Sequence, residues 1–139
     1  PPERFKSIIN FSNFLLQFLK LYQTERDISL DDKFLLKEFC YPDNLSDSIN
    51  FIVNLLRYRV LFDEYIIKRE GEEKDWDWSI NKIYKTNDGD FDYKETFNNE
   101  KERDLIKMIQ SMFHVTFPTN TYKTWLFKTI KFIWNNNTS

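Results

Sequence analysis

Apolar residues recur at helical spacing in five segments of this chain. The first, Glu3–Gln23, places them three or four residues apart, and Phe14 and Phe18 widen its apolar face. The second begins at Ser29, a residue suited to cap a helix N-terminus, and Pro42 marks its stop. The last two segments are Asn99–Val115 and Tyr122–Trp134. The pattern predicts a helix over each segment.

The third segment, Asn44–Glu70, is apolar on two sides. One stripe is formed by Ile49, Ile52, Val53, Leu56 and Val60, and the other by Phe51, Leu55, Phe62 and Ile66. Two apolar sides are typical of a helix that is covered all round. We therefore expect this segment to be the central helix, with Ser46 as its cap. Arg59 and Asp63 lie four residues apart beside the first stripe, a spacing that predicts a structural ion pair.

Residues 71–100 differ from the rest because they are acidic and have no sustained helical period. The stretch Asn87–Asp90 is a turn signal, which predicts a small hairpin between Ser79–Tyr84 and Phe91–Lys94. The fold class expected from these patterns is all-α. We expect residues 1–139 to form a single-domain bundle of about five helices, with residues 71–100 as one acidic loop or small hairpin insertion.

Composition agrees with one folded domain. The chain has 139 residues, of which 41% are hydrophobic and 18% aromatic, so it can bury a core built largely from rings. No apolar run approaches the roughly 20 residues of a membrane span, so we expect a soluble, cytoplasmic protein with no membrane partner. The start at Pro1, without methionine, favours a fragment of a longer protein. The single cysteine, Cys40, and single histidine, His114, exclude a disulfide and predict no cofactor and no metal site.

Charge is unevenly distributed. Residues 70–104 contain 6 basic and 12 acidic groups, whereas residues 105–139 contain 4 lysines and no acidic group. The last helix carries Lys123, Phe127, Lys131 and Trp134 along one side. Rings among cations can stack on bases while the cations neutralise phosphates, so these four residues are candidates for nucleic-acid contact. Internal pairing with the acidic segment, and lysines that extend over a packed helix, explain the same pattern.

Two further features look like chemical sites. His114 has no neighbouring Ser, Cys or Asp motif, so we expect a scaffold residue at a helix end rather than a catalytic base. The run Asp88–Asp92 resembles a calcium loop, but Tyr93 and Asn99 occupy the positions where an EF-hand needs glycine and glutamate. A solvated turn is the better interpretation. No catalytic residue is predicted.

Three stretches nevertheless resemble a known family. They are "SLDDKFLLKEF" (29–39), "FIVNLLRYRVLFDEYIIKRE" (51–70) and "LIKMIQSMFHVTFPTNTYKTWL" (105–126). Together they resemble the helical region downstream of the ParB-like nuclease domain in GmrSD-like restriction endonucleases of bacterial defence systems. The runs "RYRVLFDEYIIK" and "QSMFHVTFP…YKTWL" are the specific parts, and the three stretches cover about half of the chain.

The resemblance implies a role inside a larger protein. Members of that family carry an Asp-Gly-Gln-Gln-Arg-type motif and often a His-Asn-His nuclease domain, and neither motif occurs here. It therefore implies a non-catalytic domain that links or positions the catalytic domains of a phage-defence endonuclease on DNA, with the rest of the parent polypeptide as its partner. The alternative is a stand-alone helical protein-interaction module.

Overall fold

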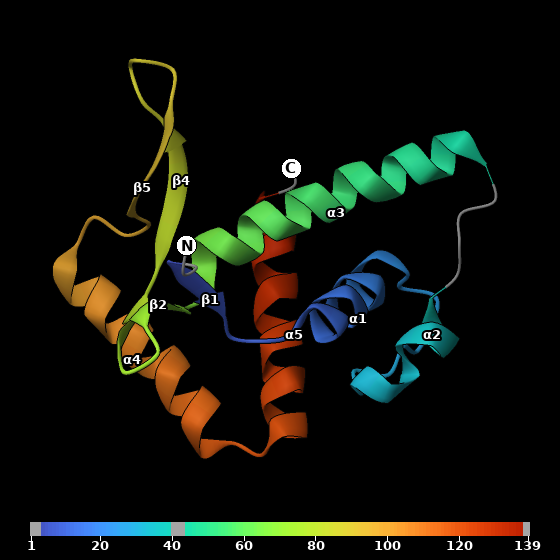
Figure 1. Cartoon of the computed structure of the whole chain (residues 1–139). Coiled ribbons are helices and arrows are strands. Elements are labelled where there is room, and N and C mark those ends of the chain that lie inside the picture. The colour runs from blue at the N-terminus through green and yellow to red at the C-terminus, as the bar shows by residue number, and fades with distance from the viewer. Residues whose placement is uncertain (1–3, 40–43, 138–139) are drawn as a thin grey trace. The chain divides into compact units, whose positions relative to one another are not determined.

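The fold combines helices with antiparallel sheet, so the all-α prediction is wrong. The computed structural model describes residues 4–39 and 44–137. In this part of the chain the helices are α1 (Phe11–Tyr22), η1 (Asp32–Phe34), α2 (Leu35–Glu38), α3 (Leu45–Tyr65), α4 (Glu100–Thr116) and α5 (Thr119–Asn137) (Figure 1). The strands are β1 (Phe5–Ser7), β2 (Lys68–Glu72), β3 (Asp75–Ser79), β4 (Asn81–Lys85) and β5 (Phe91–Glu95). Cys40 and Pro42 lie outside the described residues.

The chain folds as two compact units. Unit 1 comprises residues 1–8 and 62–117, and unit 2 comprises residues 9–61 and 118–139. The division falls within α3, so most of this helix belongs to unit 2 and its last residues to unit 1. Each unit is therefore built from segments that are distant in the sequence.

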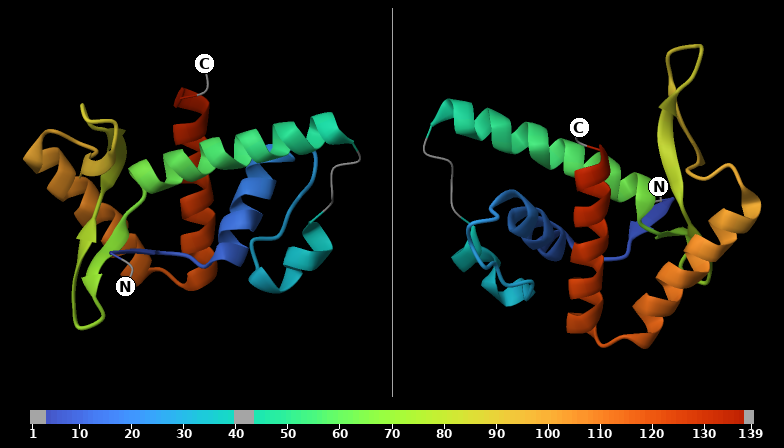
Figure 2. Two further views of the ribbon diagram at one scale, coloured as in Figure 1. Left: turned by 45° about the horizontal axis from the view of Figure 1, so that its top comes forward. Right: turned by 180° about the vertical axis from the view of Figure 1, so that it is seen from behind.

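Unit 2 has an aromatic core. The ring of Tyr58 on α3 is fully buried and lies 5.1 Å from Phe14 and 5.4 Å from Phe18, both on α1. Phe51, two turns earlier on α3, packs edge-on against Phe18. Trp134 on α5 lies 6.5 Å from Tyr58. Figure 2 shows α1 next to α5 in both views, and the two helices are joined by a hydrogen bond from Gln17 Nε2 to the Lys123 carbonyl.

Helix α1 begins later than the pattern predicts. Asn10 caps it by accepting a hydrogen bond from the Asn13 amide. Phe5–Ser7 instead form β1, which pairs antiparallel with β2. Similarly, Asn44 rather than Ser46 caps α3 by accepting from the Asp47 amide. The 29–39 segment is capped by Asp31, not Ser29, and forms the short η1 and α2.

Helix α3 ends at Tyr65, five residues before the predicted end at Glu70. Its last carbonyls accept hydrogen bonds from side chains: Asp63 from Lys68, Glu64 from Thr96, and Tyr65 from Gln110. The Gln110 oxygen also accepts from the Ile67 amide. In a longer helix these carbonyls would accept from backbone amides. Because side chains donate to them instead, the chain can leave the helix and form β2 without unpaired carbonyl groups.

Unit 1 contains two small sheets. The strands β1, β2 and β3 form one sheet in that order, and β4 pairs with β5 in another. The β4–β5 hairpin confirms the hairpin predicted around Asn87–Asp90. In β2, next to its last residue, Gly71 has φ +118°, and a Cβ there would lie 2.5 Å from the Asp75 carbonyl oxygen on β3. This position of the strand pair therefore requires glycine.

Helices α4 and α5 occupy the predicted segments, but their predicted inward residues are only partly buried. Leu105 and Met112 on α4 are exposed, whereas Tyr122, Leu126 and Ile130 on α5 are buried. Trp125 is half-buried and stacks on Tyr122 at 5.8 Å. Over the described residues, no helix is sufficiently long and apolar to cross a membrane.

Candidate functional site

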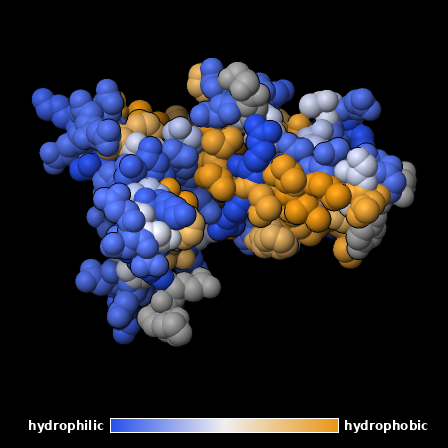
Figure 3. Space-filling view, turned by 90° about the horizontal axis from the view of Figure 1, so that it is seen from above, coloured by the Kyte–Doolittle hydropathy of each residue, from blue (hydrophilic) through white to orange (hydrophobic). Residues whose placement is uncertain are grey.

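One face of α3 presents a continuous set of exposed aliphatic side chains, which we call the apolar strip. Its members are Leu45, Ile49, Ile52, Val53, Leu56 and Val60. Their exposed fractions range from 49% to 76%. At 100° per residue these positions lie within about 100° of helix surface. Figure 3 shows hydrophobic side chains gathered along this helix, with hydrophilic ones beside them.

The opposite face of α3 is buried. Phe51, Tyr58 and Phe62 are each less than a tenth exposed, and Leu55 is half-buried. The sequence predicted both stripes of this helix to face inward, and for the first stripe this is wrong. Helical periodicity identifies an apolar face but carries no information on what covers it.

Two arginines border the strip and turn away from it. The Arg57 guanidinium lies 5.3 Å from the Trp134 ring centre, and that of Arg59 lies 5.2 Å from Phe14. Both rings belong to the aromatic core on the other side of the helix. Cation–π contacts therefore hold both guanidinium groups toward the rings of the core and away from the apolar strip. Arg59 is exposed, and its ion pair with Asp63 stays a prediction.

The strip differs from an ordinary exposed apolar residue. Leu36 on α2 is 91% exposed but is a single leucine, which is common on protein surfaces. Six aliphatic residues on one helix face form a contiguous patch. Patches of this kind are typical of protein interaction sites, because covering them removes apolar surface from water at about 25 cal/mol per Å².

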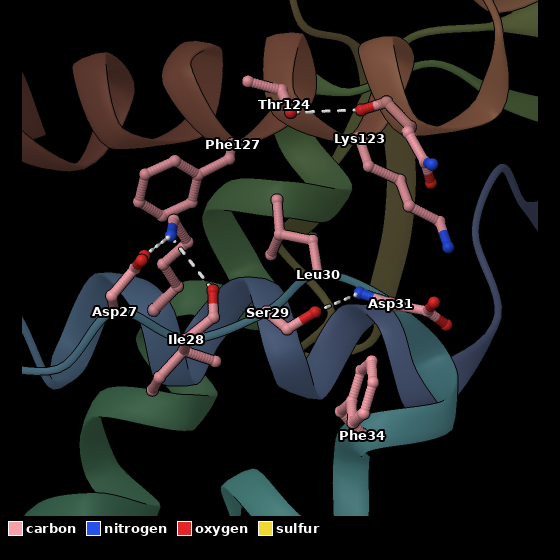
Figure 4. Close-up of a pocket in the computed structure, with 11 residues that line it drawn as sticks. Asp27, Ile28, Ser29, Leu30, Asp31, Phe34, Lys123, Thr124 and Phe127 are labelled. Atoms are coloured by element: carbon pink, nitrogen blue, oxygen red, sulfur yellow. Dashed lines mark hydrogen bonds and ion pairs between the residues drawn. The ribbon is translucent and has the colours of Figure 1, made fainter.

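A second candidate is a pocket in unit 2 with a volume of about 480 Å³. It lies between the residues that follow α1 and the first turns of α5, and Figure 4 shows the Phe127 ring pointing toward Asp27 and Ile28. The Lys20 ammonium donates to Asp27 and to the Ile28 carbonyl at 3.2 and 3.0 Å, and lies 5.5 Å from the Phe127 ring. The cation is thus already held by groups of the pocket wall.

The second cation of the pocket is also paired. Lys123 Nζ donates to Asp32 Oδ1 at 3.2 Å, and Asn10 and Asn13 donate to the same carboxylate. Burial acts to raise the pKa of Asp32, but these hydrogen bonds and the Lys123 charge outweigh it and hold the pKa below its usual value. This network ties α1, η1 and α5 together, so its evident role is structural.

The four residues of α5 that the sequence suggested for nucleic-acid contact differ in their surroundings. Lys123 and Phe127 line the pocket, Trp134 packs near Tyr58 and Arg57, and Lys131 is exposed. Lys123 forms an ion pair with Asp32, which lies outside the acidic segment 70–104. The contact with nucleic acid stays a prediction, and the surroundings of Lys123 and Trp134 do not favour it.

His114 lies near the end of α4 and packs edge-on against Trp78 of β3, with ring centres 5.7 Å apart. Burial, with a smaller contribution from the Arg69 charge, lowers the pKa of His114. Arg69 itself lies over Trp76 and Trp78 at 4.8 and 5.8 Å. This cluster was not predicted, although two tryptophans spaced two residues apart are a strand signal.

The acidic run Asp88–Asp92 includes part of the turn of the β4–β5 hairpin and the first two residues of β5, and the Thr86 amide and hydroxyl both donate to the Asp90 carbonyl. Among the described residues, no three His, Cys, Asp or Glu side chains are grouped as metal ligands. Comparison with protein-family models, curated proteins and solved structures finds no match to this chain.

Proposed function

We propose that this chain is an interaction domain that binds protein through the apolar strip of α3. The observation that carries the proposal is the contrast between the two faces of this helix. The buried face already fills the core of unit 2, so the strip is not needed to complete that core. Six aliphatic side chains held on a rigid helix form a surface of the kind that a protein partner covers.

The resemblance to GmrSD-like endonucleases extends this proposal to the parent protein. Two of the stretches that carry it cover most of α3, most of α4 and the first part of α5. On this proposal the domain links or positions the catalytic domains of a phage-defence endonuclease, with the rest of the parent polypeptide as a partner. Such an endonuclease acts on DNA inside the cell, so the proposal also assigns the domain to the cytoplasm.

The docking role is tested by site-specific photo-cross-linking in cells that make the chain. A benzophenone amino acid replaces Leu56 in the strip or, as the matched control, Leu36 on α2. We expect irradiation to yield a discrete protein adduct from position 56 and none from position 36. Equal adduct patterns, or no adduct from position 56, would overturn the proposal.

The parent-protein proposal needs a different measurement. In a full-length endonuclease that contains this domain, replacing Ile52 and Leu56 by serine is expected to reduce phage restriction strongly. The Leu36→Ser protein is expected to restrict like wild type. Full restriction by the Ile52→Ser, Leu56→Ser protein, at normal expression, would contradict the parent-protein proposal. It would leave the proposed docking role of the apolar strip unaffected.

A further inference from the structure

The apolar strip is symmetric about its own midpoint. Successive members, from Leu45 to Val60, are separated by 4, 3, 1, 3 and 4 residues, an order that is the same in both directions. The midpoint lies between Ile52 and Val53. A two-fold interface is formed by the same surface of both copies, so that where one residue contacts a second residue of the other copy, the reverse contact also forms. About a two-fold axis at its midpoint, a strip with this order of spacings places each of its members level with another member.

We propose that the occupant of the apolar strip is a second copy of this chain, packed antiparallel along α3 about a two-fold axis between Ile52 and Val53. This inference rests on the proposed docking role and names its partner. In the pair, Leu45 meets Val60 of the second copy, Ile49 meets its Leu56, and Ile52 meets its Val53. Every member of the strip then contacts an aliphatic residue.

The arginines at the border disfavour the parallel orientation. In the antiparallel pair, Arg57 lies at the level of Ser48 of the second copy and Arg59 at the level of its Ser46, so the arginines of the two copies are separated along the helix axis. In a parallel pair, the arginines of both copies would lie at the same level, where like charges repel even though each guanidinium turns toward its own core. The antiparallel pair also aligns the two helix dipoles in opposite directions, which is favourable.

The size of the strip sets the expected strength. From Leu45 to Val60 it is about 22 Å long, and a helix with its side chains is about 10 Å wide. A standard interface covers roughly 800 Å² on each partner, and this strip is smaller. We therefore expect a dimer that forms reversibly as concentration rises, rather than an obligate one.

The first test measures the mass of the purified full chain by light scattering over a concentration series from micromolar to near-millimolar. Wild type is expected to rise from the 17.1 kDa of one chain toward twice that value. Leu56→Ser is expected to remain a monomer, and the matched variant Leu36→Ser to behave like wild type. A wild-type monomer at every concentration, or a dimer unaffected by Leu56→Ser, would overturn the proposal.

The second test determines the orientation. In a Cys40→Ser background, Leu45→Cys and Val60→Cys chains are oxidised separately and as a mixture. The antiparallel pair predicts a disulfide-linked dimer from the mixture only, because identical positions would lie about 22 Å apart along the helices. Linked dimers from either chain alone, with none of the mixed kind, would show parallel packing and refute the arrangement.

Together with the cross-linking experiment, these tests separate the two proposals. If the chain stays a monomer but position 56 gives an adduct with a different protein, the proposal of a second copy is wrong and the proposed docking role stands. A monomer with no adduct overturns both. A reversible dimer with the mixed disulfide supports both.

Discussion

The two faces of α3 are both apolar but differ in the chemistry of their side chains. The buried face is largely aromatic, with Phe51, Tyr58 and Phe62, and the rings of Phe51 and Tyr58 each contact several other rings. The exposed face is aliphatic throughout, with Ile, Val and Leu only. Large rings suit an irregular core formed by several elements, whereas a row of aliphatic side chains suits packing against one straight partner. Within this helix, residue type therefore distinguishes the core face from the exposed face.

The largest expected effect on the free energy of unfolding comes from removing a ring from the aromatic face. Tyr58→Ala is expected to lower the free energy of unfolding by about 4 kcal/mol, because it removes a fully buried ring at the centre of unit 2. Urea melts at low protein concentration measure this change. The matched variant Leu56→Ala, two residues away on the exposed face, is expected to cost less than about 1 kcal/mol. Equal losses for the two variants would contradict the assignment of the faces.

A smaller effect is expected at the point where α3 ends. Gln110→Ala leaves the Tyr65 carbonyl and the buried Ile67 amide without their side-chain partner and is expected to cost about 2 kcal/mol. Met108→Ala, at an exposed position on the same helix, serves as the control. Hydrogen exchange at the Ile67 amide is expected to accelerate in Gln110→Ala alone. An unchanged exchange rate would mean that this hydrogen bond does not hold the helix end.

His114 provides an intermediate case, since it is half-buried against Trp78. Its lowered pKa means that the folded chain binds fewer protons than the unfolded chain at pH values below about 6.5. Stability is therefore fully present above that pH and falls as the pH decreases. We expect His114→Phe to lose this dependence between pH 7.5 and 5.5, in which range the sequence has no other histidine. Identical pH profiles of unfolding for the two proteins would refute it.

The smallest change is expected on the apolar strip itself. Val53→Thr keeps the shape of the side chain and its branching at Cβ, so it tests burial with little effect on helix propensity. In dilute protein we expect a change of less than about 0.5 kcal/mol in the free energy of unfolding, as for other surface substitutions. A loss above about 1.5 kcal/mol would show that the strip is already covered in the single chain.

The sequence predicted much of the fold that depends on local pattern. Helices α4 and α5 and the β4–β5 hairpin lie where periodicity and the Asn87–Asp90 turn signal placed them. The β1–β2–β3 sheet was missed because Lys68–Glu72 has no alternation of apolar and polar residues. That strand depends on distant groups, Thr96 and Gln110, which stop the preceding helix. Five of the six residues of the strip, all except Leu45, were identified as one stripe, but their exposure depends on tertiary structure that periodicity does not encode.

The interleaving of the two units has a consequence for synthesis. The chain passes between units after residues 8, 61 and 117, so α1 and most of α3 are made well before α5. At roughly 5–20 residues per second, a ribosome needs about 3–11 s to make residues 62–117. During that interval the rings of Phe14, Phe18 and Tyr58 lack Trp134, and Gln17 lacks its acceptor on Lys123. The nascent chain is therefore most prone to aggregation just before its last helix emerges, which is when a chaperone would protect it most.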